Sequence, residues 1–336
     1  MAVVCSLAND LTLTKPLHTW RCPIWSDTGI LLLVALAKIL LHTLTNNQYG
    51  FHRDELATID DAHYLAWGYV AYPPLTPFVA RVALQLFGTS LVGLRLFTAL
   101  AGGAAVVLSG LIAREMGGKR SAQIIASVAV ATAPISLVSG SLFQYVGFDY
   151  LWWVLLAYLV VRLLNSDDSR WWVAIGVVIG FGVMTKYTIL FLVAGLVIGV
   201  LLSPIRHHLR STWLWIGVVL SLLIFLPNLI WQVQHDFISL DFLRSIYARD
   251  IRIGRTDNFL VGQLLTGAGL FTIPIALAGL VWLFRAKGGQ YRLLGWMFVT
   301  PLVLFAVARG RDYYQAPAYP VPIFWIINRA HGAHKY

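Results

Sequence analysis

Long apolar runs recur along this chain, and they constrain its fold more than any other feature. A helix needs about 20 apolar residues to cross a bilayer, and most of these runs are apolar on every face, which indicates contact with lipid or with neighbouring helices all round. They lie at 29–45, 89–112, 122–140, 148–164, 171–185, 188–203, 212–228, 259–284, 293–308 and 316–328. We therefore predict an all-α fold, a polytopic membrane bundle of about ten transmembrane helices.

The composition excludes a soluble domain. Charged residues make up 12% of the 336 residues and hydrophobic residues 58%, whereas an average globular chain is about a quarter charged. Cys5 and Cys22 lie ahead of the first run, so no disulfide framework is predicted. The N-terminus lacks the layout of a cleavable signal. We predict a cytoplasmic tail over 1–28, a transmembrane domain over 29–328 and a second tail over 329–336.

The charges of alternate loops predict the orientation. With the first tail inside, the cytoplasmic loops hold 14 of the 25 Lys and Arg residues but only 5 of the 15 Asp and Glu residues, in line with the positive-inside rule. These loops carry +9 of the chain's net charge of +10, and no nucleic-acid partner is predicted. The other ten carboxylates lie mostly in two outer segments, 46–88 and 229–258, with a short third one at 309–315. This clustering indicates a site at the lipid–water boundary.

Two other classes of function stay open at this point. A transporter or lipid flippase usually places ionisable residues within its spans and repeats its segments. Here Lys38 is the one charged residue near the middle of an apolar run, and the sequence shows no internal repeat. A non-catalytic membrane scaffold would give the outer carboxylates no special role.

The first outer segment, 46–88, is too long to be a mere connection. Its apolar and aromatic residues before Pro73-Pro74 are spaced for one helical face, which predicts an amphipathic helix lying on the membrane. That face holds Leu56, Ile59, His63, Tyr64 and Trp67. The helix would begin at Arg53-Asp54-Glu55, where Asp54 could be a capping residue. Asp60 and Asp61 are expected to lie on a solvent-exposed face of this helix.

Five stretches of the chain carry a pattern that resembles a known family. They are HRDELATIDDAHYLAWGYVAYPPLTPFVAR (52–81), SLFQYVGFDYLWWVLLAYLVVRLLNSDD (141–168), GFGVMTKYTILF (180–191), LPNLIWQVQHDF (226–237) and ARGRDYYQAPAYPV (308–321). In this order they resemble the GT-C integral-membrane glycosyltransferases, in particular the bacterial branch related to protein O-mannosyltransferases and lipid A aminoarabinose transferases. LATIDDA (56–62) departs from the aromatic-rich stretch usual there. Relatives commonly continue beyond a tenth span, so this chain would be a compact or truncated member, or would lack part of the acceptor-binding apparatus.

The resemblance implies a GT-C fold and transfer of a sugar from a dolichyl- or undecaprenyl-phosphate-linked donor. The acceptor would be a glycolipid, a polysaccharide or a protein. The enzyme would be a multi-pass protein of the inner membrane, with its active site on the periplasmic side. By motif position Asp54 would be the catalytic base, with Glu55 beside it helping to hold the site or a divalent metal cation.

The residue types of the outer segments also suit the chemistry of sugar transfer from a lipid phosphate. Displacing a lipid phosphate from an anomeric carbon needs a base for the acceptor's proton and a cation for the leaving phosphate. Asp54 suits the first role. The outer basic residues that run against the positive-inside rule suit the second: Lys186, Arg252, Arg255, Arg309 and Arg311. Lys186 is the best candidate because its neighbours are apolar, although a snorkelling lysine and solvated loop arginines are the plain alternatives.

Further residues could line the site. Arg53, His63 and Asp149 are candidates, although Asp149 could equally terminate a helix. Tyr313, Tyr314 and Tyr319 could contact sugar or form an interfacial belt. His52 and His63 could join Asp54 and Glu55 around a metal, but no spacing motif supports this. His207 and His208 are expected to lie in a cytoplasmic loop. All of this requires acidic and cationic side chains from distant stretches to meet in one pocket on the non-cytosolic side.

Overall fold

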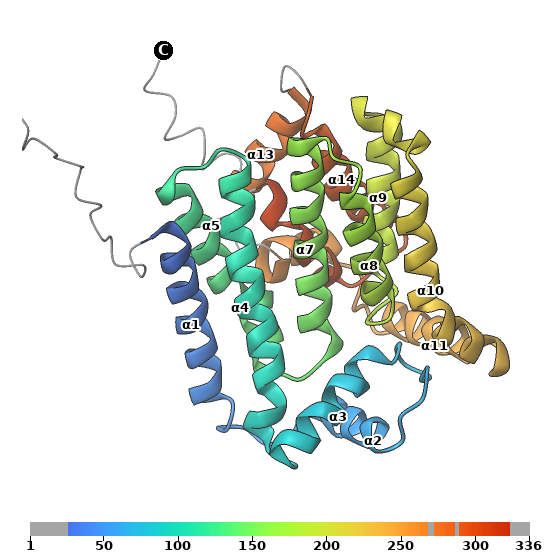
Figure 1. The fold of residues 1–336 in the computed structure, drawn as a ribbon. Helices are drawn as coiled ribbons and strands as arrows, with labels where there is room; N and C mark the ends of the chain where they lie inside the picture. The colour runs from blue at the N-terminus through green and yellow to red at the C-terminus, as the bar shows by residue number, and fades with distance from the viewer. Residues whose placement is uncertain (1–25, 268–271, 286–288, 323–336) are drawn as a thin grey trace, which may run out of the picture.

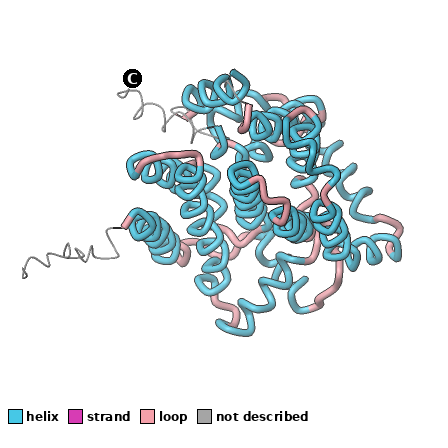
Figure 2. Tube along the Cα trace, turned by 45° about the horizontal axis from the view of Figure 1, so that its top comes forward, coloured by secondary structure: helices cyan, strands magenta, loops and turns pink. Residues whose placement is uncertain are grey.

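The computed structural model describes residues 26–267, 272–285 and 289–322, and within these ranges it contains helices and no strand (Figures 1 and 2). The helices are α1 (Asp27–Thr45), α2 (Arg53–His63), α3 (Leu75–Phe87), α4 (Leu91–Glu115), α5 (Arg120–Thr132), α6 (Pro134–Ser141), α7 (Tyr145–Ser166), α8 (Trp171–Val183), α9 (Ile189–Leu201), η2 (Pro204–Arg210), α10 (Thr212–Gln234), α11 (Ile238–Arg252), α12 (Phe259–Gly262), η3 (Gln263–Gly267), α13 (Ile273–Arg285), α14 (Arg292–Val307) and η4 (Asp312–Ala318). The predicted all-α class is confirmed.

The prediction of about ten spans is not confirmed. Among the described helices, α1, α4, α7 and α10 are long and apolar enough to cross a membrane, and the number rises to six if the bent pairs α5–α6 and α9–η2 each form one span. The apolar runs do not set helix length by themselves, because a proline can interrupt a helix within a run. Proline begins α6 and η2, and it cannot continue the preceding helix regularly. Most of the predicted tail 1–28, the end of the span 316–328 and the tail 329–336 lie outside the described residues.

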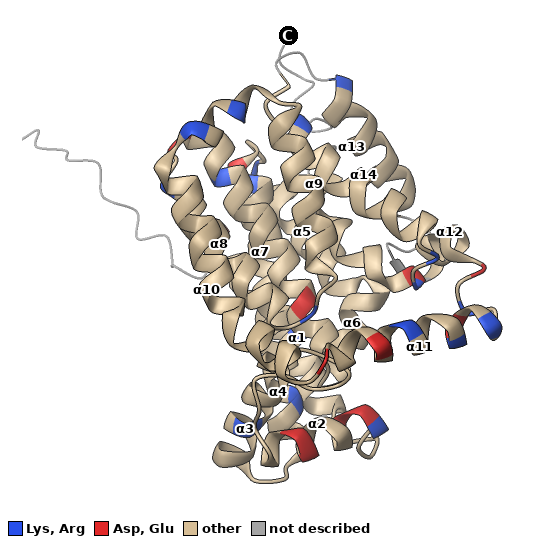
Figure 3. Cartoon of the chain, turned by 90° about the vertical axis from the view of Figure 1, so that its right-hand side faces the viewer, with Lys and Arg blue, Asp and Glu red and all other residues tan. Residues whose placement is uncertain are grey.

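The long helices run side by side, and α2, α3 and α11 lie together at one end, the lower end in Figure 1. We call this the α2 end. The turn between α7 and α8 lies at the opposite end, together with η2. Charged residues gather at these two ends and on α11 (Figure 3). The arrangement agrees with the predicted alternation of the loops, whereas the side of the membrane that each end faces stays a prediction.

Close packing in the bundle depends on small residues where helices meet. α8 packs on α10, α9 on α14, and both α1 and α7 on α4. A Cβ atom at Gly176 would overlap the backbone of Gly217 on the facing helix, and one at Gly217 would overlap Trp172. Elsewhere large apolar side chains on α1 and α10 remain exposed, such as Leu32 and Leu222. Exposed apolar surface of this extent fits contact with lipid.

The α2 helix is shorter than the predicted amphipathic helix. It ends at His63, and it buries Glu55, Thr58 and Ala62 while Leu56 is exposed. The chain turns because the Tyr69 hydroxyl donates to the carbonyl oxygens of Asp61 and Tyr64 and accepts from the amide of Ala66. The helix is therefore too short to hold Tyr64 and Trp67 on the predicted face, and whether its exposed side, which includes Leu56, lies on the membrane surface stays a prediction.

Asp61 is also not a solvated residue. It is half-buried, and its Oδ2 accepts a hydrogen bond of 2.5 Å from the Tyr72 hydroxyl, while Asp60 is exposed. Burial raises the pKa of Asp61 above its ordinary value, although the bond from Tyr72 opposes the rise. Because the Tyr72 ring also packs on Tyr145, Asp61 links α2 to the start of α7.

Candidate active site

The N-terminus of α2 is fixed by two reciprocal capping bonds. The His52 side chain accepts a hydrogen bond from the amide of Asp54, and Glu55 Oε2 accepts one from the amide of His52 at 2.8 Å. Such pairs satisfy the amides that a first turn leaves free. The side chain that caps α2 is thus that of His52, and the carboxylate of Asp54 remains free for other contacts.

Glu55 is fully buried, with 0% of its surface exposed. Its Oε1 accepts from Arg95 Nε at 2.8 Å and from the amide of Phe143 at 2.7 Å, and its Oε2 accepts from Arg95 Nη2 at 2.7 Å and from the amide of His52. Burial acts to raise the pKa of Glu55, but the bonds from Arg95, Phe143 and His52 outweigh it and hold the pKa below its ordinary value.

These contacts bear on the predicted metal site. A carboxylate offers about four lone-pair positions, and all four positions of Glu55 accept protein N–H groups. Glu55 therefore does not fit a metal ligand in this arrangement, nor does it face an incoming substrate. It fits instead a clamp between α2, α4 and the turn before α7.

Asp54, next to Glu55, has a different environment. Half of its side chain is exposed (52%), its Oδ2 accepts from Gln144 Nε2 at 2.9 Å, and its Oδ1 lies 3.2 Å from Nε of the exposed Arg53. Asp54 is thus oriented by Gln144 and still reachable from solvent. A general base needs this combination, because it must be held in place and also touch the proton that it removes.

Lys186 lies in the turn between α8 and α9 and is buried. Its Nζ lies 3.5 Å from Oδ2 of Asp149, which also accepts from Thr188, while Asp149 Oδ1 accepts from Trp153. Asp149 is thus more than a helix terminus, because it pairs with the cation. A snorkelling lysine would extend towards water, and Lys186 does not.

Three tyrosine rings surround the Lys186 ammonium. Its Nζ lies 4.2 Å from the ring centre of Tyr314, 5.2 Å from that of Tyr145 and 5.5 Å from that of Tyr313. Such distances are typical of cation–π interactions, which stabilise a desolvated cation. Burial raises the pKa of Tyr314 above its ordinary value, so its hydroxyl stays protonated. The tyrosines of η4 therefore belong to the cation's surroundings, rather than to a belt at the membrane surface alone.

Arg311 adds a second cation to this region. Its Nε donates to Asp250 Oδ2 at 2.6 Å, and its Nη1 donates to the Tyr313 hydroxyl at 3.1 Å. Burial opposes the charge on Arg311, but the bond with Asp250 raises its pKa above the ordinary value. Asp250, which also accepts from Arg249, has its pKa lowered because these bonds outweigh its burial.

The turn before α7 joins these groups to Asp54. Gln144 bonds to Asp54, and the next residue, Tyr145, faces Lys186. The structure thus brings together Asp54, Asp149, Lys186, Arg311, Tyr313 and Tyr314. Of the other predicted site residues, His52 lies beside Asp54 and Gln144, and Arg53 contacts only Asp54. The exposed His63, Arg252, Arg255 and Arg309 make no described contact with the group.

Four residues of this region were not singled out from the sequence. Gln144 and Tyr145 lie within the 141–168 motif, and Arg95 is a lone charge within the apolar run 89–112, so each carried a signal. Asp250 carried none, because only the folded chain shows that it meets Arg311, 61 positions later.

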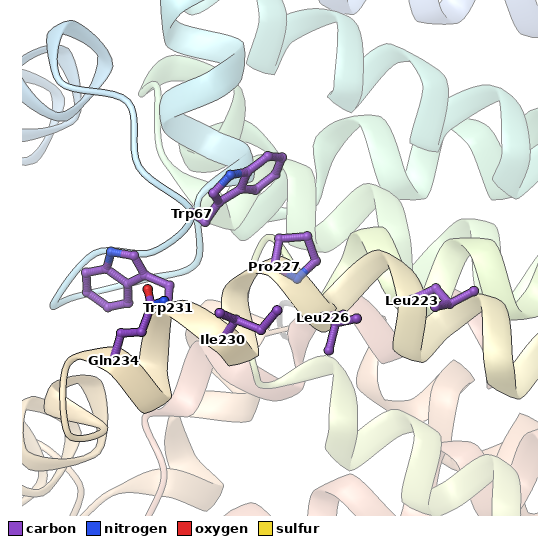
Figure 4. A pocket seen from close by; sticks show the side chains of 7 residues that line it. All are labelled: Trp67, Leu223, Leu226, Pro227, Ile230, Trp231 and Gln234. Carbon is purple, nitrogen blue, oxygen red and sulfur yellow. The ribbon is translucent and has the colours of Figure 1, made fainter.

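Two cavities lie beside the group rather than within it. The first, of about 430 Å³, is formed by the loop after α2 and by α10 (Figure 4). It is lined by Trp67, Leu223, Leu226, Pro227, Ile230, Trp231 and Gln234. Asn228 Nδ2 donates to the carbonyl of Trp67, and Asn228 Oδ1 accepts from the Tyr187 hydroxyl. Asn228 therefore links the wall of this cavity to Tyr187, the residue that follows Lys186 in the sequence. The second, of about 510 Å³, is apolar and lies between α8, α9 and α10.

Comparisons with known proteins agree with this geometry. Residues 71–231 match the family described as dolichyl-phosphate-mannose-protein mannosyltransferase. An undecaprenyl phosphate-alpha-4-amino-4-deoxy-L-arabinose arabinosyl transferase of Pseudomonas fluorescens is 28% identical over 282 residues, covering 77% of this chain and 49% of the relative. The lipid A galacturonosyltransferase RgtD of Rhizobium johnstonii is 29% identical over 190 residues, covering 53% and 39%. This chain is thus similar to membrane sugar transferases of this kind over most of its length.

Solved structures show the same GT-C fold. ArnT from Cupriavidus metallidurans, bound to undecaprenyl phosphate, superposes with a TM-score of 0.68 at 19% identity, covering 93% of this chain and 61% of that one. The Archaeoglobus fulgidus oligosaccharyltransferase superposes with a TM-score of 0.60 at 13% identity, covering 94% and 51%. This chain thus spans about half to three fifths of the length of the GT-C proteins that match over most of it.

Proposed function

We propose that this GT-C protein transfers a sugar from a polyprenyl-phosphate-linked donor to an acceptor at the α2 end of the bundle. One observation carries the proposal: a reachable carboxylate, Asp54, is linked to Lys186 through the consecutive residues Gln144 and Tyr145, and a second cation, Arg311, is linked to Lys186 through Tyr313. A base and an anion site side by side are what displacement of a phosphate from a sugar requires.

In the proposed step the acceptor's hydroxyl oxygen attacks the anomeric carbon of the donor sugar, and the bond from that carbon to the phosphate oxygen breaks. The phosphate leaves with the bonding electron pair, and the hydroxyl proton passes to the carboxylate of Asp54. A single displacement of this kind inverts the configuration at the anomeric carbon.

The leaving phosphate would bind among the cations and the tyrosine hydroxyls. Lys186 and Arg311 already pair with Asp149 and Asp250, so these carboxylates orient the cations and limit the excess positive charge. The Tyr313 hydroxyl accepts from Arg311, which leaves its own hydrogen to donate to a phosphate oxygen. The proposed anion site therefore combines two oriented cations with at least one neutral donor.

The names of the relatives narrow the substrates. One is named for undecaprenyl phosphate-linked aminoarabinose and another for lipid A. We propose an undecaprenyl-phosphate-linked sugar as the donor and a glycolipid as the acceptor, with a polysaccharide or a protein as alternatives. The α2 end would then face the periplasmic side of the inner membrane, where the donor and the acceptor both lie in the lipid layer.

The test is Asp54→Asn in the full-length chain, with transfer of labelled sugar from the donor lipid measured in membrane vesicles. Loss of a general base typically slows a reaction by about 100- to 10,000-fold. Asp60→Asn is the matched control, because Asp60 lies on the same helix, is exposed and stands outside the group. Wild-type transfer by Asp54→Asn, at equal protein levels, would remove Asp54 from the proposed role.

A further inference from the structure

A second polar group lies at the end of the bundle opposite α2. Within the described part of the chain, Asp167, His207 and His208 form the one group of three or more His, Cys, Asp or Glu side chains whose ligating atoms all lie within 4.8 Å of one another. Asp167 ends α7, whereas the two histidines belong to η2, about 40 positions later. The group therefore joins the α7–α8 turn to the connection between α9 and α10.

The distances within the group fit a shared ligand. Asp167 Oδ1 lies 3.0 Å from His208 Nε2 and 3.2 Å from His207 Nε2. Zinc binds imidazole nitrogen and carboxylate oxygen at about 2.0–2.2 Å in tetrahedral geometry, which places its ligand atoms about 3.3–3.5 Å apart. Asp167 Oδ1 would therefore have to move away from each histidine nitrogen by only about 0.1–0.5 Å to admit the ion, and the ligand atoms of all three residues already lie within 4.8 Å of one another.

The surroundings of His208 add a second observation. Its side chain is 1% exposed, its Nδ1 lies 2.8 Å from the Ser169 hydroxyl, and its ring packs edge-on against Trp172. Zinc-binding histidines characteristically have their second ring nitrogen held by such a hydrogen-bond partner, which fixes the ring. The side chains of Asp167 and His207 are 66% and 57% exposed, so an ion would have access from water.

We propose that Asp167, His207 and His208 bind one zinc ion, with water in the fourth position, and that the ion clips the α7–α8 turn to η2. Imidazole and carboxylate ligands suit a borderline divalent metal such as zinc, whereas calcium and magnesium prefer oxygen ligands alone. The site lies at the opposite end from Asp54, so it would act on the stability of the bundle rather than on sugar transfer.

The test uses the full-length chain in detergent, treated with EDTA, dialysed and titrated with zinc chloride by calorimetry. The wild type should bind one more equivalent of zinc than His207→Ala and His208→Ala. The His207 side chain is exposed, so its removal leaves the packing of the bundle unchanged. Ser169→Ala should retain the equivalent but weaken it by about 10- to 100-fold. His235→Ala, which removes an exposed histidine at the other end of the bundle, should bind as the wild type does.

Thermal unfolding followed by tryptophan fluorescence gives an independent measurement. Zinc should raise the unfolding midpoint of the wild type and of His235→Ala, but not that of His207→Ala. Equal zinc stoichiometry and affinity in the wild type and in His207→Ala would overturn the proposal and leave a plain His–Asp hydrogen-bond cluster. Neither measurement depends on transferase activity, so this inference can fail or stand independently of the proposed function.

Discussion

The clamp around Glu55 allows the sharpest prediction, through the substitution Glu55→Gln. Each carboxylate oxygen of Glu55 accepts two N–H donors: Arg95 Nε and the Phe143 amide at one oxygen, and Arg95 Nη2 and the His52 amide at the other. A glutamine has one carbonyl oxygen and one amide nitrogen. Whichever way it turns, its nitrogen faces two donors.

The magnitude follows from these contacts. Leaving a buried donor unpaired costs about 1–3 kcal/mol, so two such donors cost about 2–6 kcal/mol. A second estimate comes from the ion pair: removing one partner of a buried pair costs about 3–5 kcal/mol. It applies here because Arg95 is also buried, with only 3% of its side chain exposed. We therefore expect Glu55→Gln to lower the free energy of unfolding by about 4 kcal/mol.

The assay is unfolding of the purified chain by a denaturing detergent, followed by tryptophan fluorescence. Asp60→Asn, an exposed change on the same helix, should alter the free energy by no more than about 0.5 kcal/mol. Glu55→Gln and Arg95→Met together should destabilise by at least about 2 kcal/mol less than the sum of the single effects, because residues in direct contact couple. A stability change below about 1 kcal/mol in Glu55→Gln would refute the clamp.

The same clamp predicts a pH dependence of stability. Arg95, Phe143 and His52 outweigh burial and lower the pKa of folded Glu55, so folding favours the ionised form. The stabilisation is fully present above the pKa of the unfolded chain, about 4.3, and is lost as the pH falls through the lower folded value. Glu55→Gln should remove this part of the acid dependence, whereas Asp60→Asn should leave it in place.

Two further substitutions test how the base and the cation are held. Gln144→Ala removes the bond that orients Asp54, so kcat should fall by about tenfold with little change in KM; an unchanged kcat would exclude this orienting role. Lys186→Met leaves Asp149 buried without its cation and should destabilise the fold by about 3–5 kcal/mol. Adding Asp149→Asn should restore stability but not transfer, and transfer by the double variant would show that Lys186 does not hold the phosphate.

Local features of the sequence were sufficient for the fold class and for part of the site. The apolar runs predicted an all-helical membrane bundle, and the charges of the outer segments drew attention to Asp54, Lys186 and Arg311. They were less informative about α2, which is shorter than predicted and buries Glu55 and Thr58. Glu55 can be buried because Arg95 from a distant helix pairs with it, and local periodicity does not reveal such a partner.

By itself, the sequence determined that this chain forms helices in a lipid environment, because the hydropathy of a segment depends only on residues that are neighbours in the sequence. Only the tertiary structure decided which charges meet. Glu55 pairs with Arg95, Asp149 with Lys186, and Asp250 with Arg311, each across 37 to 61 positions of the chain. A buried charge must find an opposite charge or enough hydrogen-bond partners, and which partner it finds depends on how the helices pack.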